Sequence, residues 1–207
     1  MPPKAKFSKE EIVEAAFEIV RKSGEEALTA REVAAYLGVS TRPIFTYFKT
    51  MDELKNEVRK TAAERYRAYT EEGLSEEVPL YGFFKRYQSF AGENPNLYKL
   101  LFMSRNKNGE GTWQSFYEPL HSKVIDSVMR IYKMDEKTAE SYLKNMMIVS
   151  NGFLSTTISN CCPYAKNEVQ KIGPLFSLAL CRAYKEIPGF ADGNVDINAE
   201  FIKLIGK

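Results

Sequence analysis

Residues 28–49 (LTAREVAAYLGVSTRPIFTYFK) limit what this chain can fold into more than any other stretch. Thr29 and, three residues later, Glu32 form the pattern of a capping box, in which two side chains satisfy backbone N–H groups at a helix start. Apolar residues then recur at helical spacing on one face, at Val33, Ala34 and Leu37. Gly38 follows at the position where helices end in a left-handed residue, a conformation that glycine adopts at little cost.

A second short helix is predicted directly after this turn. Ser40 is a suitable N-cap, and Ile44 and Phe48, four residues apart, face the same core as the first helix. The side chains left facing outward are Thr41, Arg42, Thr46 and Tyr47. Two short helices joined by a tight turn are the layout of a helix-turn-helix, whose second helix enters the major groove of DNA.

Arg31 and Arg42 favour this DNA-binding interpretation. Each lies at about the second position of its predicted helix, where the helix dipole disfavours a cation by roughly 0.3–1 kcal/mol. A phosphate backbone lying across both helix starts would supply the missing anion. Pro43 is compatible with the first turn, because an N–H at that position would have no helical partner. The alternative is a solvated corner of two helices with no ligand.

Helices are predicted on both sides of this pair. Ser8 with Glu11 and Thr50 with Glu53 repeat the capping pattern, and an apolar helical period follows each of them. The first of these helices runs to about residue 23 and the second to about residue 72. The pattern therefore predicts a compact helical unit in which two flanking helices brace the two-helix reader.

These segments (IVEAAFEIVRKSG and LTAREVAAYLGVSTRPIFTYFKTMDEL) resemble the DNA-binding domain of the TetR/AcrR family of bacterial transcriptional regulators. The resemblance implies an all-α protein, with a helix-turn-helix domain over residues 1–54 and a helical effector-binding and dimerisation domain over residues 55–207. It also implies a homodimer that binds a palindromic operator in double-stranded DNA, and repression as the usual mode of regulation. By position, the residues facing DNA would be Thr41, Arg42, Pro43, Thr46 and Tyr47, and those at phosphates Thr29, Arg31 and Lys49.

Aromatic side chains are concentrated between residues 81 and 117. Such a cluster fills the core of a helical domain, or it lines a pocket for a flat or lipophilic ligand. Because a regulator of this family needs an effector site, we expect a pocket for a small lipophilic, aromatic effector. The residues expected to line it are Phe83, Tyr87, Phe102, Trp113, Phe116 and Met147.

Two later segments carry apolar residues at alternating spacings of three and four, which is typical of helix bundles. We expect both to pack in a four-helix bundle across a two-fold axis. The interface residues would be Leu143, Met147, Leu154 and Phe176. The alternative is packing within one chain only.

Composition and motifs exclude several other classes. The net charge of +2 is too small for bulk attraction to DNA, so the placement of cations must matter. We find no phosphate-binding glycine loop, zinc spacing or nucleophile motif, and therefore expect no enzyme activity, cofactor or metal. With no long apolar run or signal peptide, we expect a cytoplasmic protein without a membrane partner. Cys161 and Cys162 leave a redox-sensing regulator as one alternative, and a helical adaptor protein is the other.

Overall fold

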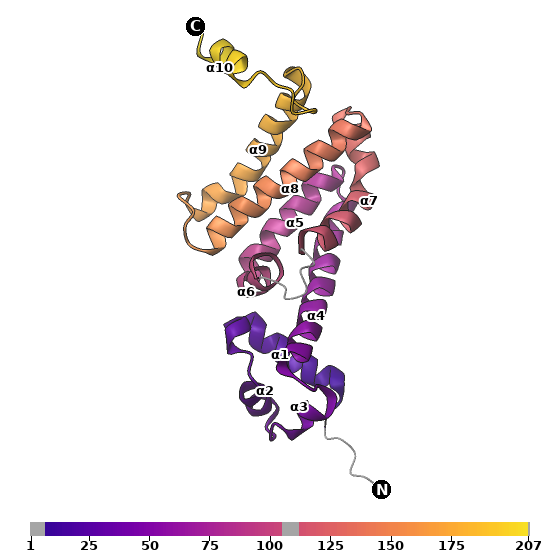
Figure 1. Ribbon diagram of the computed structural model, residues 1–207, viewed down its shortest axis with the longest axis vertical. Coiled ribbons are helices and arrows are strands. Elements are labelled where there is room, and N and C mark those ends of the chain that lie inside the picture. The colour runs from indigo at the N-terminus through magenta and orange to yellow at the C-terminus, as the bar shows by residue number, and fades with distance from the viewer. Residues whose placement is uncertain (1–6, 105–111, 207) are drawn as a thin grey trace. The chain divides into compact units, whose positions relative to one another are not determined.

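The protein is all-α, as its sequence predicts. A computed structural model describes residues 7–104 and 112–206, without the side chains of residues 112–115, 166, 167 and 170, and this part of the chain contains no strand. The α-helices (Figure 1) are α1 (Lys9–Ser23), α2 (Ala30–Leu37), α3 (Arg42–Tyr47), α4 (Met51–Glu71), α5 (Pro79–Glu93), α6 (Pro95–Tyr98), α7 (Thr112–Tyr132), α8 (Glu136–Ile158), α9 (Lys166–Glu186) and α10 (Ile197–Ile205). Short 3-10 turns occur at Glu25–Ala27 and Glu72–Ser75, and a π-helical turn, η3, spans Lys99–Met103.

The chain divides into two compact units. The N-terminal unit comprises Met1–Glu71 together with Ser89–Gly109, and the C-terminal unit comprises Glu72–Gln88 together with Glu110–Lys207. The N-terminal unit thus extends beyond the domain expected over residues 1–54 and takes in α6 and η3. The chain first passes from the N-terminal unit to the C-terminal unit at the end of α4. Helix α5 begins in the C-terminal unit and ends in the N-terminal unit, so it is a second covalent link between them.

The core of the N-terminal unit forms around α1, which packs against α2, α4 and α6. Its buried side chains include those that the helical spacing predicts, namely Ile12, Ala16, Val20, Val33, Ala34, Ile44 and Phe48. The capping box at Ser8 is present in full, since the Ser8 hydroxyl accepts from the Glu11 N–H and Glu11 accepts from the Ser8 N–H. These local signals explain why the bounds of α1, α2 and α4 agree with the sequence to within about a residue.

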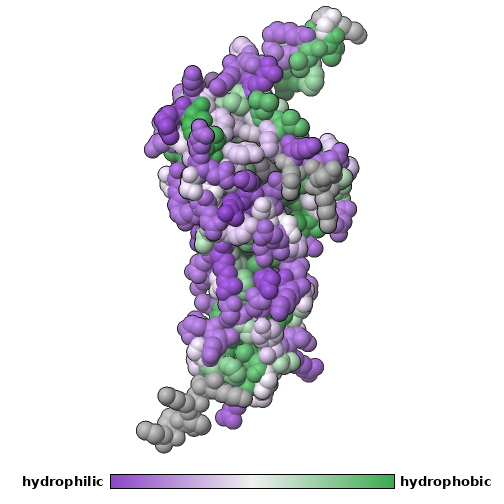
Figure 2. All heavy atoms as spheres, turned by 180° about the vertical axis from the view of Figure 1, so that it is seen from behind, coloured by the Kyte–Doolittle hydropathy of each residue, from purple (hydrophilic) through white to green (hydrophobic). Residues whose placement is uncertain are grey.

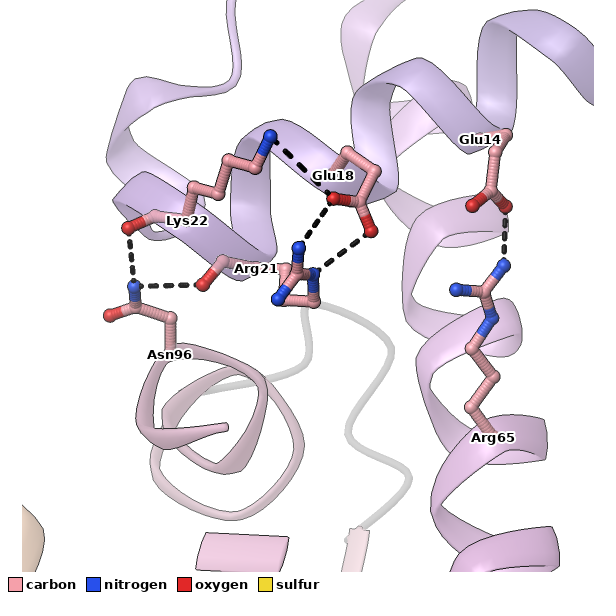
Figure 3. Close-up of polar contacts among 6 residues, drawn as sticks. All are labelled: Glu14, Glu18, Arg21, Lys22, Arg65 and Asn96. Carbon is pink, nitrogen blue, oxygen red and sulfur yellow. Dashed lines mark hydrogen bonds and ion pairs between the residues drawn. The ribbon is translucent and has the colours of Figure 1, made fainter. Parts of the chain in front are cut away.

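Polar contacts fasten α6 and η3 to α1 and α4 of the same unit. The Asn96 amide donates to the carbonyls of Arg21 and Lys22 at the end of α1, at 3.2 and 3.1 Å (Figure 3). Arg21 in turn donates two hydrogen bonds to Glu18, which hold the pKa of that carboxyl below its usual range. From α4, the mostly buried Arg59 guanidinium donates to the Leu100 carbonyl of η3. Residues 94–104 are therefore an integral part of the N-terminal unit, which also contains α2 and α3.

The C-terminal unit is built on α8, which packs against α7 and α9. Its core contains Val124, Val128, Leu143, Met146, Met147 and Leu154. A polar layer sets the register of α8 and α9, because the Tyr184 hydroxyl is bonded to Ser141 at 2.6 Å and the Tyr142 hydroxyl to Ser177 at 2.7 Å. Burial raises the pKa of Tyr142, so its hydroxyl stays protonated.

Two glycines meet in this unit, at a point where the sequence alone suggests only a break between helices. Gly73 lies in the turn before α5 and Gly82 lies in α5 itself. A Cβ added at Gly82 would lie 2.0 Å from the Gly73 carbonyl oxygen, and one added at Gly73 would lie 2.3 Å from the Gly82 oxygen. Since both obstacles are backbone atoms, this close packing requires glycine at both positions.

Candidate nucleic-acid interface

The turn between α2 and α3 has the geometry of a helix-turn-helix. Gly38 is left-handed, at φ 67° and ψ 38°, and its N–H bonds back to α2. The Val39 N–H also bonds back, to the Ala34 carbonyl at 3.0 Å. With Ala34 and Ile44 both buried, the turn fixes the two helices against one core and leaves their opposite faces exposed.

The start of α3 differs from the sequence prediction. We expected Ser40 to cap this helix, but the N-cap is Thr41, whose dihedrals are already helical and whose side chain makes no capping bond. Arg42 and Pro43 are then the first two residues of α3. The helix start therefore lacks a side-chain oxygen over its free N–H groups, which suits a phosphate oxygen at that position.

Three of the five residues expected to face DNA lie on the exposed face of α3. Arg42, Thr46 and Tyr47 are exposed, while Thr41 and Pro43 are half-buried beside them. The hydroxyl of Thr46 donates to the Arg42 carbonyl at 3.1 Å, and that of Tyr47 donates to the Phe7 carbonyl at 3.0 Å. Both hydroxyls are thus held in place and keep lone pairs with which to accept a hydrogen bond.

Sequence reasoning missed two exposed aromatic side chains. Phe45 in α3 and Tyr36 in α2 are both about half exposed, at 49% and 52%. Helical spacing did not assign Phe45 because it lies about 100° around the helix from the buried Ile44. An apolar ring on a helix that enters the major groove can contact a thymine methyl group, so Phe45 is a further candidate for base recognition.

The three cations of the helix-turn-helix segment are exposed, and none of them is in an ion pair within the described chain. Across residues 7–104 and 112–206, no acidic side chain forms an ion pair with Arg31, Arg42 or Lys49, whereas α1 and α4 carry several paired cations. Thr29 caps α2 by accepting from the Glu32 N–H at 3.2 Å, so it stands at the same helix start as Arg31. The Lys49 N–H donates to Glu53 at 2.7 Å, which fixes the backbone of Lys49 and leaves its ammonium group free to reach a phosphate.

The expected effector residues are divided between the two units. Phe83, Tyr87, Phe116 and Met147 are buried in the C-terminal unit. There the rings of Phe83 and Tyr87 stack, with centroids 6.0 Å apart, and the Tyr87 hydroxyl donates to Asn151 at 3.2 Å. Phe102 lies in the N-terminal unit, against the rings of Tyr66 and Tyr98. The Trp113 side chain lies outside the described residues.

Three of the four residues expected at the dimer interface are buried within the single chain. Leu143, Met147 and Leu154 pack in the core of the C-terminal unit and have no surface to offer a partner. Phe176, in contrast, is 49% exposed in α9. The same three-and-four spacing is found where helices pack within one chain and where they pack between chains, so the spacing of α8 is accounted for by packing within this chain.

The fold and the site together define the class of protein. Residues 12–58 match the model of a family described as bacterial regulatory proteins, tetR family. A solved structure of a TetR family member from Streptomyces coelicolor A3 is similar to this chain, with a TM-score of 0.58 and 16% identity over 84% of this chain and 98% of the other. At that identity the likeness shows the fold alone. Comparison with curated proteins found no match.

A helix-turn-helix with an exposed, cationic second helix, on an all-α fold of this kind, is a DNA-binding transcriptional regulator. The match at residues 12–58 supports a regulator of the TetR family, as the resemblance of the N-terminal segments predicted. Regulators of this family are typically dimers that bind small-molecule effectors, and they are generally not enzymes. Among the described residues no helix is long and apolar enough to cross a membrane, and no cluster of side chains is suited to hold a metal ion.

Proposed function

We propose that this protein is a dimeric repressor that leaves a palindromic operator when a small lipophilic, aromatic effector binds its C-terminal unit. One observation supports DNA recognition above all others. The start and exposed face of α3 and the start of α2 present Arg42 and Arg31 with no acidic partner among the described residues, beside the polar side chains of Thr46 and Tyr47. In this proposal Arg42 and Thr46 contact bases, and Arg31, Thr29 and Lys49 contact phosphates.

The short recognition helix is the reason to propose a palindromic operator. Helix α3 has six residues, and one such helix contacts too few base pairs to be selective. We therefore expect selection of bound sites from random DNA to yield an inverted repeat, with half-sites about 10 base pairs apart or at a multiple of that spacing. Recovery of a single unrepeated half-site would contradict the dimeric mode of binding. Failure to enrich any sequence would contradict the proposed function itself.

The proposed effector site uses aromatic and polar side chains of the C-terminal unit. Stacked Phe83 and Tyr87 offer aromatic faces, and the Asn151 amide, bonded to the Tyr87 hydroxyl, offers a polar group beside them. Phe116 and Met147 add apolar surface in the same unit. A flat, largely apolar molecule with one hydrogen-bonding group matches this combination. Its binding lowers operator affinity to the extent that it favours the conformation that binds DNA poorly.

Trp113, the only tryptophan, offers a way to find the effector without knowing its identity. In a screen of small aromatic compounds we expect a ligand that quenches Trp113 fluorescence to weaken operator binding as well. Asn151→Ala should weaken binding of that ligand about two- to twelvefold, which corresponds to the 0.5–1.5 kcal/mol of one neutral hydrogen bond. The same variant should bind operator normally when no ligand is present. If every quenching ligand leaves operator affinity unchanged, the aromatic cluster is simply core.

A further inference from the structure

The last helix of the chain has an apolar face with little packed against it. Helix α10 contains five large apolar side chains that are 50–78% exposed, at Ile197, Phe201, Ile202, Leu204 and Ile205. Most of them share one helical face, at positions i, i+4, i+7 and i+8. Within the described chain no other element packs extensively on α10, and Figures 1 and 2 show it beyond the end of α9, with hydrophobic atoms at the surface.

The sequence nevertheless specifies this helix at both ends. The Asp196 carboxylate accepts from the Ala199 N–H at 3.0 Å, and Gly206 ends the helix in the left-handed conformation, at φ 70°. A helix of nine residues is marginal in water on its own and needs packing against other surface to persist. A capped helix with so much exposed apolar surface is therefore suited to burial against a partner.

A second apolar surface of the same unit points to the identity of that partner. At the middle of α9, Leu175, Phe176 and Leu178 are 49–62% exposed. A two-fold contact between two copies can be centred on this turn, because an isologous interface brings the same surface of both copies together. A stable dimer buries about 800 Å² on each side, from roughly 20–30 residues. Three side chains of α9 can form only the centre of such an interface, so further surface must contribute.

We propose that α10 is a dimerisation arm that packs on the second copy of this chain. The two α9 helices meet at Phe176 and run antiparallel, so that the end of one lies beside the beginning of the other. Each α10 follows its own α9 by about ten residues and then covers the partner's corner between α8 and α9. That corner, residues 159–165, exposes the Tyr164 ring and the Cys161 thiol. The inference rests on the dimer of the proposed function and adds the element that stabilises it.

Charging the apolar face of α10 tests this role in the full-length protein. We expect Phe201→Glu with Leu204→Glu to raise the dimer dissociation constant at least 100-fold by sedimentation, while the circular dichroism of the remaining helices persists. Ala199→Glu is the matched control, because Ala199 lies on the opposite side of the same helix from Phe201 and Leu204. It should change the constant less than threefold. A double variant that dimerises as tightly as the wild type overturns the proposal.

Cross-linking identifies the surface that α10 covers. With Cys181→Ser as background, Leu204→Cys should be joined by a short bis-maleimide to Cys161 or Cys162 of the partner subunit. Mixing isotope-labelled and unlabelled protein separates links between copies from links within one copy by peptide mass spectrometry. Links within one copy, or dimers without a link from position 204 to that corner, overturn the proposal. A wild-type dimer that fails to bind DNA would refute the proposed function and leave the arm intact.

Discussion

Gly82→Ala is expected to lower the free energy of unfolding of the C-terminal unit by at least about 3 kcal/mol. The new Cβ would lie 2.0 Å from the carbonyl oxygen of Gly73, well inside van der Waals contact. Overpacking usually costs about 1–3 kcal/mol because side chains can shift to relieve it. Here the obstacle is backbone, so relief requires moving the turn of residues 72–75 away from α5. Urea unfolding followed by circular dichroism at fixed protein concentration measures the loss.

Gly92→Ala in the same helix is the matched control. No atom lies within 4 Å of a Cβ added at Gly92, and this glycine is exposed. The substitution should therefore stabilise α5 by about 0.5–1 kcal/mol, since alanine has the higher helix propensity. If Gly82→Ala costs less than about 1 kcal/mol, the contact between Gly73 and Gly82 is not rigid. Gly73→Ala should resemble Gly82→Ala, because its Cβ would also meet backbone.

Local signals account for the parts of the fold that the sequence predicted. Ser8, Thr29 and Thr50 each accept a backbone N–H at the start of a helix, and Gly38 ends α2 in the left-handed conformation. These features depend on residues within about four positions of one another, so a single sequence reveals them. The Ser40 prediction failed within the same logic, because Thr41 is already helical and takes over the N-cap position.

Long-range packing accounts for what the sequence could not reveal. Nothing in the spacing of Leu143, Met147 and Leu154 distinguishes burial against α7 and α9 from burial against a second copy. In the sequence, Gly73 indicates the end of a helix and Gly82 a position of low helix propensity. Neither residue indicates that the two glycines contact each other. Likewise, the folded chain buries Ile44 and Phe48 but leaves Phe45 between them exposed. Each of these facts depends on which elements meet, which is a property of the folded chain.

The largest effect on function is expected for Arg42→Ala, which should weaken binding by roughly 1–3 kcal/mol per half-site. Arg42 is exposed at the first residue of α3, so its guanidinium can reach a guanine edge with two hydrogen bonds. Preference at one base position of each half-site should relax in consequence. Lys49→Ala should instead lower the affinity for all operator sequences alike, because Lys49 follows the end of α3 and is proposed to contact a phosphate. Both variants are measured against all single-base changes of the selected operator.

Salt dependence separates the two roles independently of sequence. Each lost phosphate contact should reduce the slope of log affinity against log salt concentration by about one. Lys49→Ala should therefore make the slope shallower by about one. Lys99→Ala, which removes an exposed cation of η3 in the same unit, should change neither slope nor preference. If Arg42→Ala lowers affinity equally for every operator variant and reduces the slope, Arg42 contacts phosphate as Arg31 is proposed to do. Base recognition would then pass to Thr46 and Phe45, which share the exposed face of α3. Replacing thymine by uracil would test Phe45, because only the methyl group is removed.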